Sequence, residues 1–240
     1  MTPTELTSKS PDWKSLSGKV LEGGYELKEI IEAEREKATF RVRVLGDYSL
    51  KAAASFYLLD RNEGEDQIAV WGALRTVENR SNLSIPLGTG TLDLGGTNTS
   101  YLVFQVPDET LEEVLGSRAL APEEAIEVLR SIAKGLQELH ANGFVHGCIS
   151  SREVLAVGNG IELSTQSIRR INTEPIVERR AAKYLAPESG PRNLTGPSDV
   201  WCLGATLFEA LTQTAYEPGL LDEAANLKHP FGTMAACCLD

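Results

Sequence analysis

Short runs of alternating apolar and polar side chains dominate the first hundred residues, a pattern typical of strands with one buried face. Three such runs are Tyr25–Ile31, Thr39–Leu45 and Leu50–Leu59, and the alternation is strict in the second. Turn-forming stretches separate them, so we predict an antiparallel meander. Two more strand-like runs follow, at Ile85–Leu94 and Tyr101–Val106.

One helix is predicted to cross this sheet. The acidic stretch 61–66 (RNEGED) is expected to be a turn, and after it Ile68, Trp71, Leu74 and Val77 recur every three residues. This spacing places the four side chains on one face of a helix. The first half of the chain is therefore about five strands and one helix.

The rest of the chain has a pattern that favours helices. A short helix is expected near Glu109–Leu115. A long one opens at Ala121–Glu124, where a proline and two carboxylates suit a helix start, and Gly143 closes it. A third helix over 198–213 is apolar nearly all round, and Ser198 is its expected cap.

The order of these elements predicts an α+β chain with a small β-rich lobe and a larger, mainly helical lobe. Residues 1–18 are polar and rich in turn formers, so we expect a flexible leader pinned by Trp13. The small lobe is expected over 19–106 and the large lobe over 107–240, with a short link near Gln105–Asp108.

Composition and charge exclude several classes of function. The chain has 240 residues, 42% apolar and 24% charged, which is typical of a globular protein. Asp and Glu number 34 against 23 Lys and Arg, so the net charge of -11 would repel phosphate backbones and anionic lipids. No apolar run is long enough for a membrane span, and no signal peptide is evident. We expect a cytoplasmic protein that does not bind nucleic acid.

Several stretches follow one another in the order and spacing of the protein kinase family, which this chain therefore resembles. They are Leu139–Val157 (catalytic loop), GIELSTQS at 160–167, the Ala186-Pro187-Glu188 element, the Asp199–Gly204 core (DVWCLG) and His229–Asp240. The resemblance covers residues 20–240 and implies a bilobal kinase-like fold, similar to bacterial serine/threonine kinases. The family's DPxxR segment is absent, so the C-terminal end of the large lobe is expected to be missing.

The resemblance also implies that the groups needed for phosphoryl transfer have been replaced. The positions of the family's HRDLxxxN and DFG elements are occupied, in order, by His146, Gly147, Cys148, Glu153, Thr165, Gln166 and Ser167. Only the histidine is retained. The proton-accepting aspartate has become Cys148, and of two metal ligands only the carboxylate of Glu153 remains. We expect no catalytic residue and no metal site, with these positions as degenerate equivalents.

The turn in place of the family's glycine-rich loop is altered as well. Such a loop works because bare backbone N–H groups close over the phosphates. Here the turn reads IEAEREKATF and has no glycine. Glu32, Glu34 and Glu36 would instead bring negative charge toward a triphosphate.

Lys51 is the candidate for the lysine that binds the phosphates, because it is the lysine in the expected strand. The alternative is a solvated lysine at the strand's end. The acid that would pair with it on the crossing helix is Glu63 or Glu65, and both could equally be solvated residues of a polar turn.

Three residues are expected to support the scaffold. The resemblance implies that His146 packs beneath the catalytic loop and that Asp199 holds the loop's backbone through its carboxylate. Glu188 pairs in the family with an arginine beyond DPxxR. In this chain it is either paired by residues of a longer protein or solvated.

Positive charge gathers in the segment 167–184 of this acidic chain. Its cations are Arg169, Arg170, Arg179, Arg180 and Lys183. They could dock an acidic or phosphorylated protein partner, and the alternative is a solvated segment.

The function expected from these observations is that of a kinase-homology domain without catalysis, acting as a regulatory or protein-binding module. Two alternatives stay open: an atypical active kinase that binds ATP and magnesium, and a purely structural module in a longer protein. No cofactor is expected under the first interpretation. Fold alone cannot choose among them, since function depends on the site.

Overall fold

The structure, a computed structural model, divides into two compact units. It describes residues 11–59, 61–78, 80–173, 186–187 and 194–239. Unit 1 comprises the chain up to Arg75 and Pro86–Val106, and unit 2 comprises Thr76–Ile85 and the chain from Pro107 onward. The segment Thr76–Ile85 thus groups with unit 2, although it precedes the last two strands of unit 1.

Unit 1 is a six-stranded antiparallel sheet with one α-helix. Its elements are η1 (Trp13–Leu16, a 3-10 helix), β1 (Val20–Leu21), β2 (Tyr25–Ala33), β3 (Lys37–Val44), β4 (Ala52–Tyr57), α1 (Arg61–Leu74), β5 (Gly88–Leu94) and β6 (Thr97–Gln105). The strand order is β1-β2-β3-β4-β6-β5. The predicted meander is confirmed as β2, β3 and β4.

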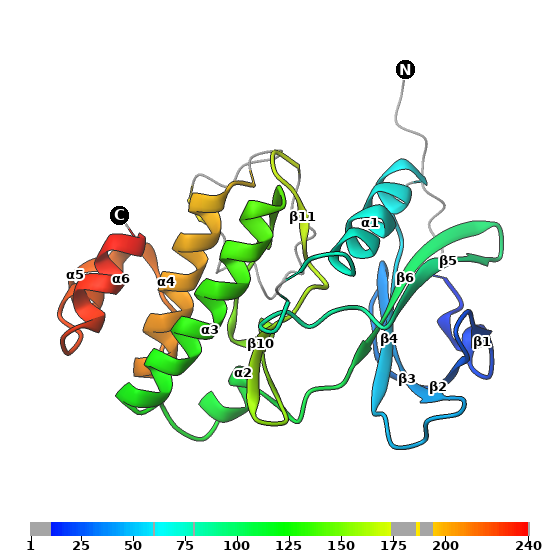
Figure 1. Cartoon of the computed structure of the whole chain (residues 1–240), viewed down its shortest axis with the longest axis horizontal. Helices are drawn as coiled ribbons and strands as arrows, with labels where there is room; N and C mark the ends of the chain where they lie inside the picture. The colour runs from blue at the N-terminus through cyan, green and yellow to red at the C-terminus, as the bar shows by residue number, and fades with distance from the viewer. Residues whose placement is uncertain (1–10, 60, 79, 174–185, 188–193, 240) are drawn as a thin grey trace. The chain divides into compact units, whose positions relative to one another are not determined.

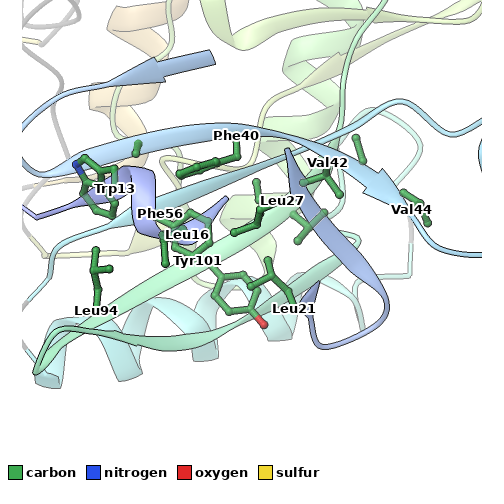
Figure 2. Packing of buried hydrophobic residues seen from close by; sticks show 14 residues of the cluster. Trp13, Leu16, Leu21, Leu27, Phe40, Val42, Val44, Phe56, Leu94 and Tyr101 are labelled. Atoms are coloured by element: carbon green, nitrogen blue, oxygen red, sulfur yellow. The ribbon is translucent and has the colours of Figure 1, made fainter. Parts of the chain in front are cut away.

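The core of unit 1 lies on one face of this sheet (Figure 2). Alternate residues of β3, among them Phe40 and Val42, point into it, as strict alternation requires. Part of the segment expected to be a flexible leader is ordered, because Trp13 and Leu16 of η1 are buried in the same core. The Trp13 indole Nε1–H donates to the backbone oxygen of Glu34, 2.9 Å away.

The helix α1 differs from its prediction at both ends. Residues 61–66 are not a turn but the first turns of α1. Gly64 lies close to β6 there, since a Cβ at this position would lie 2.6 Å from the Ser100 hydroxyl oxygen, which would have to move. The helix ends at Leu74, so Val77 is not part of it, and Val77 is instead a buried residue in the segment that groups with unit 2.

Unit 2 is mainly helical. Its elements are β7 (Glu109–Thr110), α2 (Leu111–Leu115), α3 (Pro122–Ala141), β8 (Phe144–Val145), η2 (Ser151–Glu153), β9 (Val154–Val157), β10 (Gly160–Leu163), β11 (Arg169–Arg170), α4 (Gly196–Thr212), η4 (Pro218–Leu220), α5 (Leu221–Ala225) and α6 (Phe231–Leu239). The helices α3 and α4 lie side by side, and α6 packs against α4 (Figure 1). No helix among the described residues is long and apolar enough to span a bilayer.

The long helix begins with Pro122 and ends before Gly143, which has a φ of +77°, as its end signals predict. The start of α4 was wrongly predicted. Ser198 is not the cap, because the helix begins at Gly196 and the Thr195 hydroxyl accepts the Ser198 N–H at 3.4 Å. The short helix α2 also begins later than expected, at Leu111, after a two-residue strand.

Candidate functional site

The positions that resemble the kinase catalytic loop and DFG element lie together in unit 2. The loop runs from the end of β8 to η2, and the hairpin of β9 and β10 brings the chain back beside it. The Ser164 N–H donates to the Glu153 backbone oxygen at 2.8 Å, which joins the end of β10 to the end of the loop.

His146 is completely buried at the start of this loop. Its Nε2 lies 3.0 Å from the backbone oxygen of Ser164, and the Cys148 N–H donates to its Nδ1 at 3.4 Å. A carbonyl oxygen only accepts, so these partners assign the proton to Nε2 and leave Nδ1 as the acceptor. Both ring nitrogens of His146 are thus bonded within the protein.

Asp199 on α4 holds the backbone of the same loop. Its Oδ2 accepts the His146 N–H at 2.9 Å, and its Oδ1 accepts the Gly147 N–H at 2.8 Å. The His140 Nε2, at the end of α3, lies 2.8 Å from Oδ2. Asp199 is completely buried, so this carboxylate joins two helices and the loop through hydrogen bonds that compensate its desolvation.

Gly147, at the arginine position of the family's motif, has a conformation that suits glycine. Its φ is +83°, and a Cβ at this position would lie 2.8 Å from Leu194 Cδ1. The Leu194 side chain is completely buried. The space beside Gly147 is therefore already occupied by an apolar side chain.

The two remaining loop positions differ in exposure. Cys148 is 4% exposed and forms no disulfide. The Glu153 side chain is 23% exposed, with its Oε2 4.0 Å from the His146 Nε2. Glu153 is thus the one carboxylate that the resemblance offers as a metal ligand in this loop, and its oxygen lies next to an N–H donor.

Thr165, at the position of the DFG aspartate, is bonded to the segment that precedes β5. The Thr165 hydroxyl donates to the backbone oxygen of Ser84, and Thr165 is 2% exposed. Gln166 and Ser167 follow it and are half-buried. Among the described residues, no group of three or more His, Cys, Asp or Glu side chains is arranged to hold a metal ion.

Unit 1 carries the turn that corresponds to the glycine-rich loop. It is a tight hairpin between β2 and β3, in which the Glu34 N–H donates to the Lys37 oxygen at 2.7 Å and Ala33 pairs with Ala38. Glu34 and Glu36 are exposed at its tip, and Glu32 is half-buried just before it. The hairpin is also held from the core side by Trp13.

The charged side chains of β2 and β3 pair with each other. Glu26 accepts from Arg43 and Lys28, and Arg41 forms an ion pair with Glu29. Hydrogen bonds from Lys28 and then from Arg43 lower the pKa of Glu26. Lys28, Arg41 and Arg43 are therefore paired with carboxylates of the same sheet.

Lys51 was expected in the strand, but it precedes the first residue of β4 and its side chain is exposed. The described strand β4 contains no lysine. The cation beside β4 is Lys37 on β3, whose Nζ lies 5.3 Å from the centre of the Tyr57 ring. The two acidic candidates, Glu63 and Glu65, lie in the first turns of α1 and are exposed.

Of the arginines expected to bind a partner, two fall within the described residues. Arg169 and Arg170 form β11, which pairs with β8. Arg170 is exposed, and its guanidinium lies 5.8 Å from the centre of the Phe144 ring. The other three cations of this prediction, Arg179, Arg180 and Lys183, lie outside the described part of the chain, as does Glu188, which was expected to support the scaffold.

Three residues that shape these sites were not predicted from the sequence: His140, Ser84 and Lys37. The first had a usable signal, since it is a histidine in the last turn of the long helix, six residues before His146. Ser84 contributes a backbone oxygen, and Lys37 is placed by strand register, so neither gives a signal in the sequence.

Comparison with known proteins identifies related sequences. The family model for protein tyrosine and serine/threonine kinases matches residues 66–227, more than half of the chain. The probable serine/threonine-protein kinase PknB of Lactococcus lactis is 29% identical over 182 residues, which cover 72% of this chain and 29% of that protein. The serine/threonine-protein kinase PrkC of Bacillus subtilis is 26% identical over 226 residues, 89% of this chain and 34% of that protein. The chain thus spans about a third of the length of these curated relatives.

Proposed function

The chain belongs to the protein tyrosine and serine/threonine kinase family, and we propose that it is a kinase-homology domain that transfers no phosphate and acts as a regulatory, protein-binding module. The observation that carries this proposal is Cys148. It is a buried thiol at the position where the family has its proton-accepting aspartate. A thiol is a poor substitute for that carboxylate, because sulfur is a weak hydrogen-bond acceptor.

The surroundings of Cys148 support the same proposal. His146, Asp199 and Thr165 all have their polar atoms bonded to other groups of the protein. In unit 1 the hairpin that corresponds to the glycine-rich loop bonds to its own backbone and carries exposed carboxylates. Both features disfavour a bound triphosphate, the first by leaving no metal ligand at the DFG position and the second by charge repulsion.

An atypical kinase is the second candidate, and two observations favour it. The curated relatives are named serine/threonine-protein kinases. Glu153 also retains a partly exposed carboxylate that could take one coordination position of magnesium. In this alternative another acid would have to replace the missing base.

The first test is a thermal-shift titration of the whole chain with ATP, with and without magnesium, followed by a phosphotransfer assay with radiolabelled ATP. Ligand that binds the native state raises the melting temperature according to RT ln(1 + [L]/Kd). We expect no magnesium-dependent shift at millimolar ATP and no transfer. A shift together with label transfer, lost in Glu153→Gln, would establish the atypical kinase instead.

The protein-binding part of the proposal has its own test. We propose an acidic or phosphorylated partner that contacts Arg170 together with Arg179 and Arg180. Binding of a phosphoserine peptide, measured by fluorescence anisotropy, should weaken in Arg170→Gln and remain unchanged in Arg130→Gln, an exposed arginine on α3. Equal binding of the phosphorylated and unphosphorylated peptides, unaffected by Arg170→Gln, would reject this partner class.

A further inference from the structure

The segment between α1 and β5 is bonded to the end of β10 in unit 2. Leu83 forms a parallel bridge with Leu163. The Leu163 N–H donates to the Asn82 oxygen at 2.8 Å, and the Ser84 N–H donates to the Leu163 oxygen at 2.9 Å. These two bonds are the pattern of a short parallel ladder.

Thr165 extends this ladder with its side chain. In a parallel ladder the next bond would run from the backbone N–H of residue 165 to the Ser84 oxygen. The Ser84 oxygen instead accepts the Thr165 hydroxyl. Thr165 and Ser84 are 2% and 7% exposed, so water cannot readily take the place of this donor.

The chain around Thr165 is fixed on its other side as well. The preceding Ser164 donates its N–H to the Glu153 oxygen, and its own oxygen lies 3.0 Å from His146 Nε2. Ser164 thus contacts two residues with titratable side chains, His146 through its ring Nε2 and Glu153 through its backbone oxygen.

We propose that Thr165 is a structural latch, in which a hydroxyl donor at the former metal-ligand position fastens residues 82–84 to β10. The position then requires a side chain that can donate. An ionised carboxylate there would place two acceptors against each other in a buried site, which is strongly unfavourable. The latch restrains the segment through which the chain leaves α1 and enters β5, and the aspartate cannot be restored without opening it.

Three variants of the whole chain test this latch: Thr165→Ser keeps the donor, Thr165→Val removes it at nearly the same volume, and Thr165→Asp replaces it with a carboxylate. The melting temperature of Thr165→Val should fall by about 3–8 °C, while Thr165→Ser should fall less. The amide of Ser84 should exchange with deuterium about tenfold faster in Thr165→Val than in the wild type. Thr173→Val is the matched control, because Thr173 makes the same hydroxyl-to-carbonyl bond, to Arg170, at an exposed site.

Thr165→Asp gives a signature that simple misfit does not. A carboxyl group that faces an acceptor has a raised pKa in the folded state, so its penalty is present at neutral pH and is relieved as the pH falls through that value. The melting temperature of this variant should approach that of wild type between pH 7.5 and pH 5. Wild-type stability and Ser84 protection in Thr165→Val would overturn the latch, and these two readouts decide the question even if the aspartate variant does not fold.

Discussion

Replacing Asp199 by alanine should remove the residue on which the loop of unit 2 depends. The carboxylate accepts three hydrogen bonds, two of them from the backbone N–H groups of His146 and Gly147, both of which are buried. Each buried donor left without a partner costs about 1–3 kcal/mol. The third donor, His140, has a side chain that is 29% exposed and can turn to water. The two backbone donors alone predict a loss of about 2–6 kcal/mol, a large part of the 5–15 kcal/mol stability that is typical of a domain.

The assay is urea unfolding of the whole chain, followed by circular dichroism and by tryptophan fluorescence. Asp199→Asn should lie between wild type and alanine, because its amide keeps one acceptor but turns an N–H toward a second donor. Asp222→Asn is the matched control, since Asp222 is an exposed carboxylate in the first turn of α5. A cost below about 1 kcal/mol for Asp199→Ala would refute the reasoning that these bonds hold the loop.

Two further predictions concern side-chain hydrogen bonds elsewhere. Bonds from Arg118 and from the Ala121 N–H hold the pKa of Glu124 at about 2, so its contribution to stability is present above the pKa of an unfolded glutamate and is lost as the pH falls toward about 2. Since the side chain is 43% exposed, Glu124→Gln should cost only about 0.5 kcal/mol at pH 7, and an NMR titration that gives Glu124 an ordinary pKa would contradict this. Trp13→Phe should cost about 0.5–1.5 kcal/mol by losing the bond to Glu34, and Trp13→Ala about 3–5 kcal/mol; thermal melts that rank the two equally would exclude a separate role for the indole N–H.

The strands of the small unit could be predicted from sequence because one face of its sheet is buried. From Thr39 to Val44 the alternation matches the inward face of β3 residue by residue, whereas Leu45 lies beyond the strand and is exposed. The start of α1 could not be predicted in this way, because acidic residues on the solvent face of a helix have the same composition as a polar turn. The structure shows instead that Gly64 lies in this helix, close to Ser100 of β6.

The candidate site was predictable in position but not in its bonding. The resemblance located His146, Cys148 and Thr165 because their neighbours keep the family's order. It did not reveal that Thr165 is bonded to Ser84, because that partner is a backbone oxygen 81 residues away in sequence. Similarly, Thr195 was missed as the cap of α4 because Ser198, three residues later, is also a residue type that caps helices.

The division of the chain affects how it can be cut and recombined. Unit 1 is interrupted by Thr76–Ile85, which groups with unit 2. A gene fragment that runs from α1 through β6 would carry this stretch away from its partners and expose Val77 and Leu83, which are now buried. Excising the stretch would instead separate α1 from β5. Neither unit is therefore a transferable module, and domain shuffling or fusion design has to move the two as one cassette.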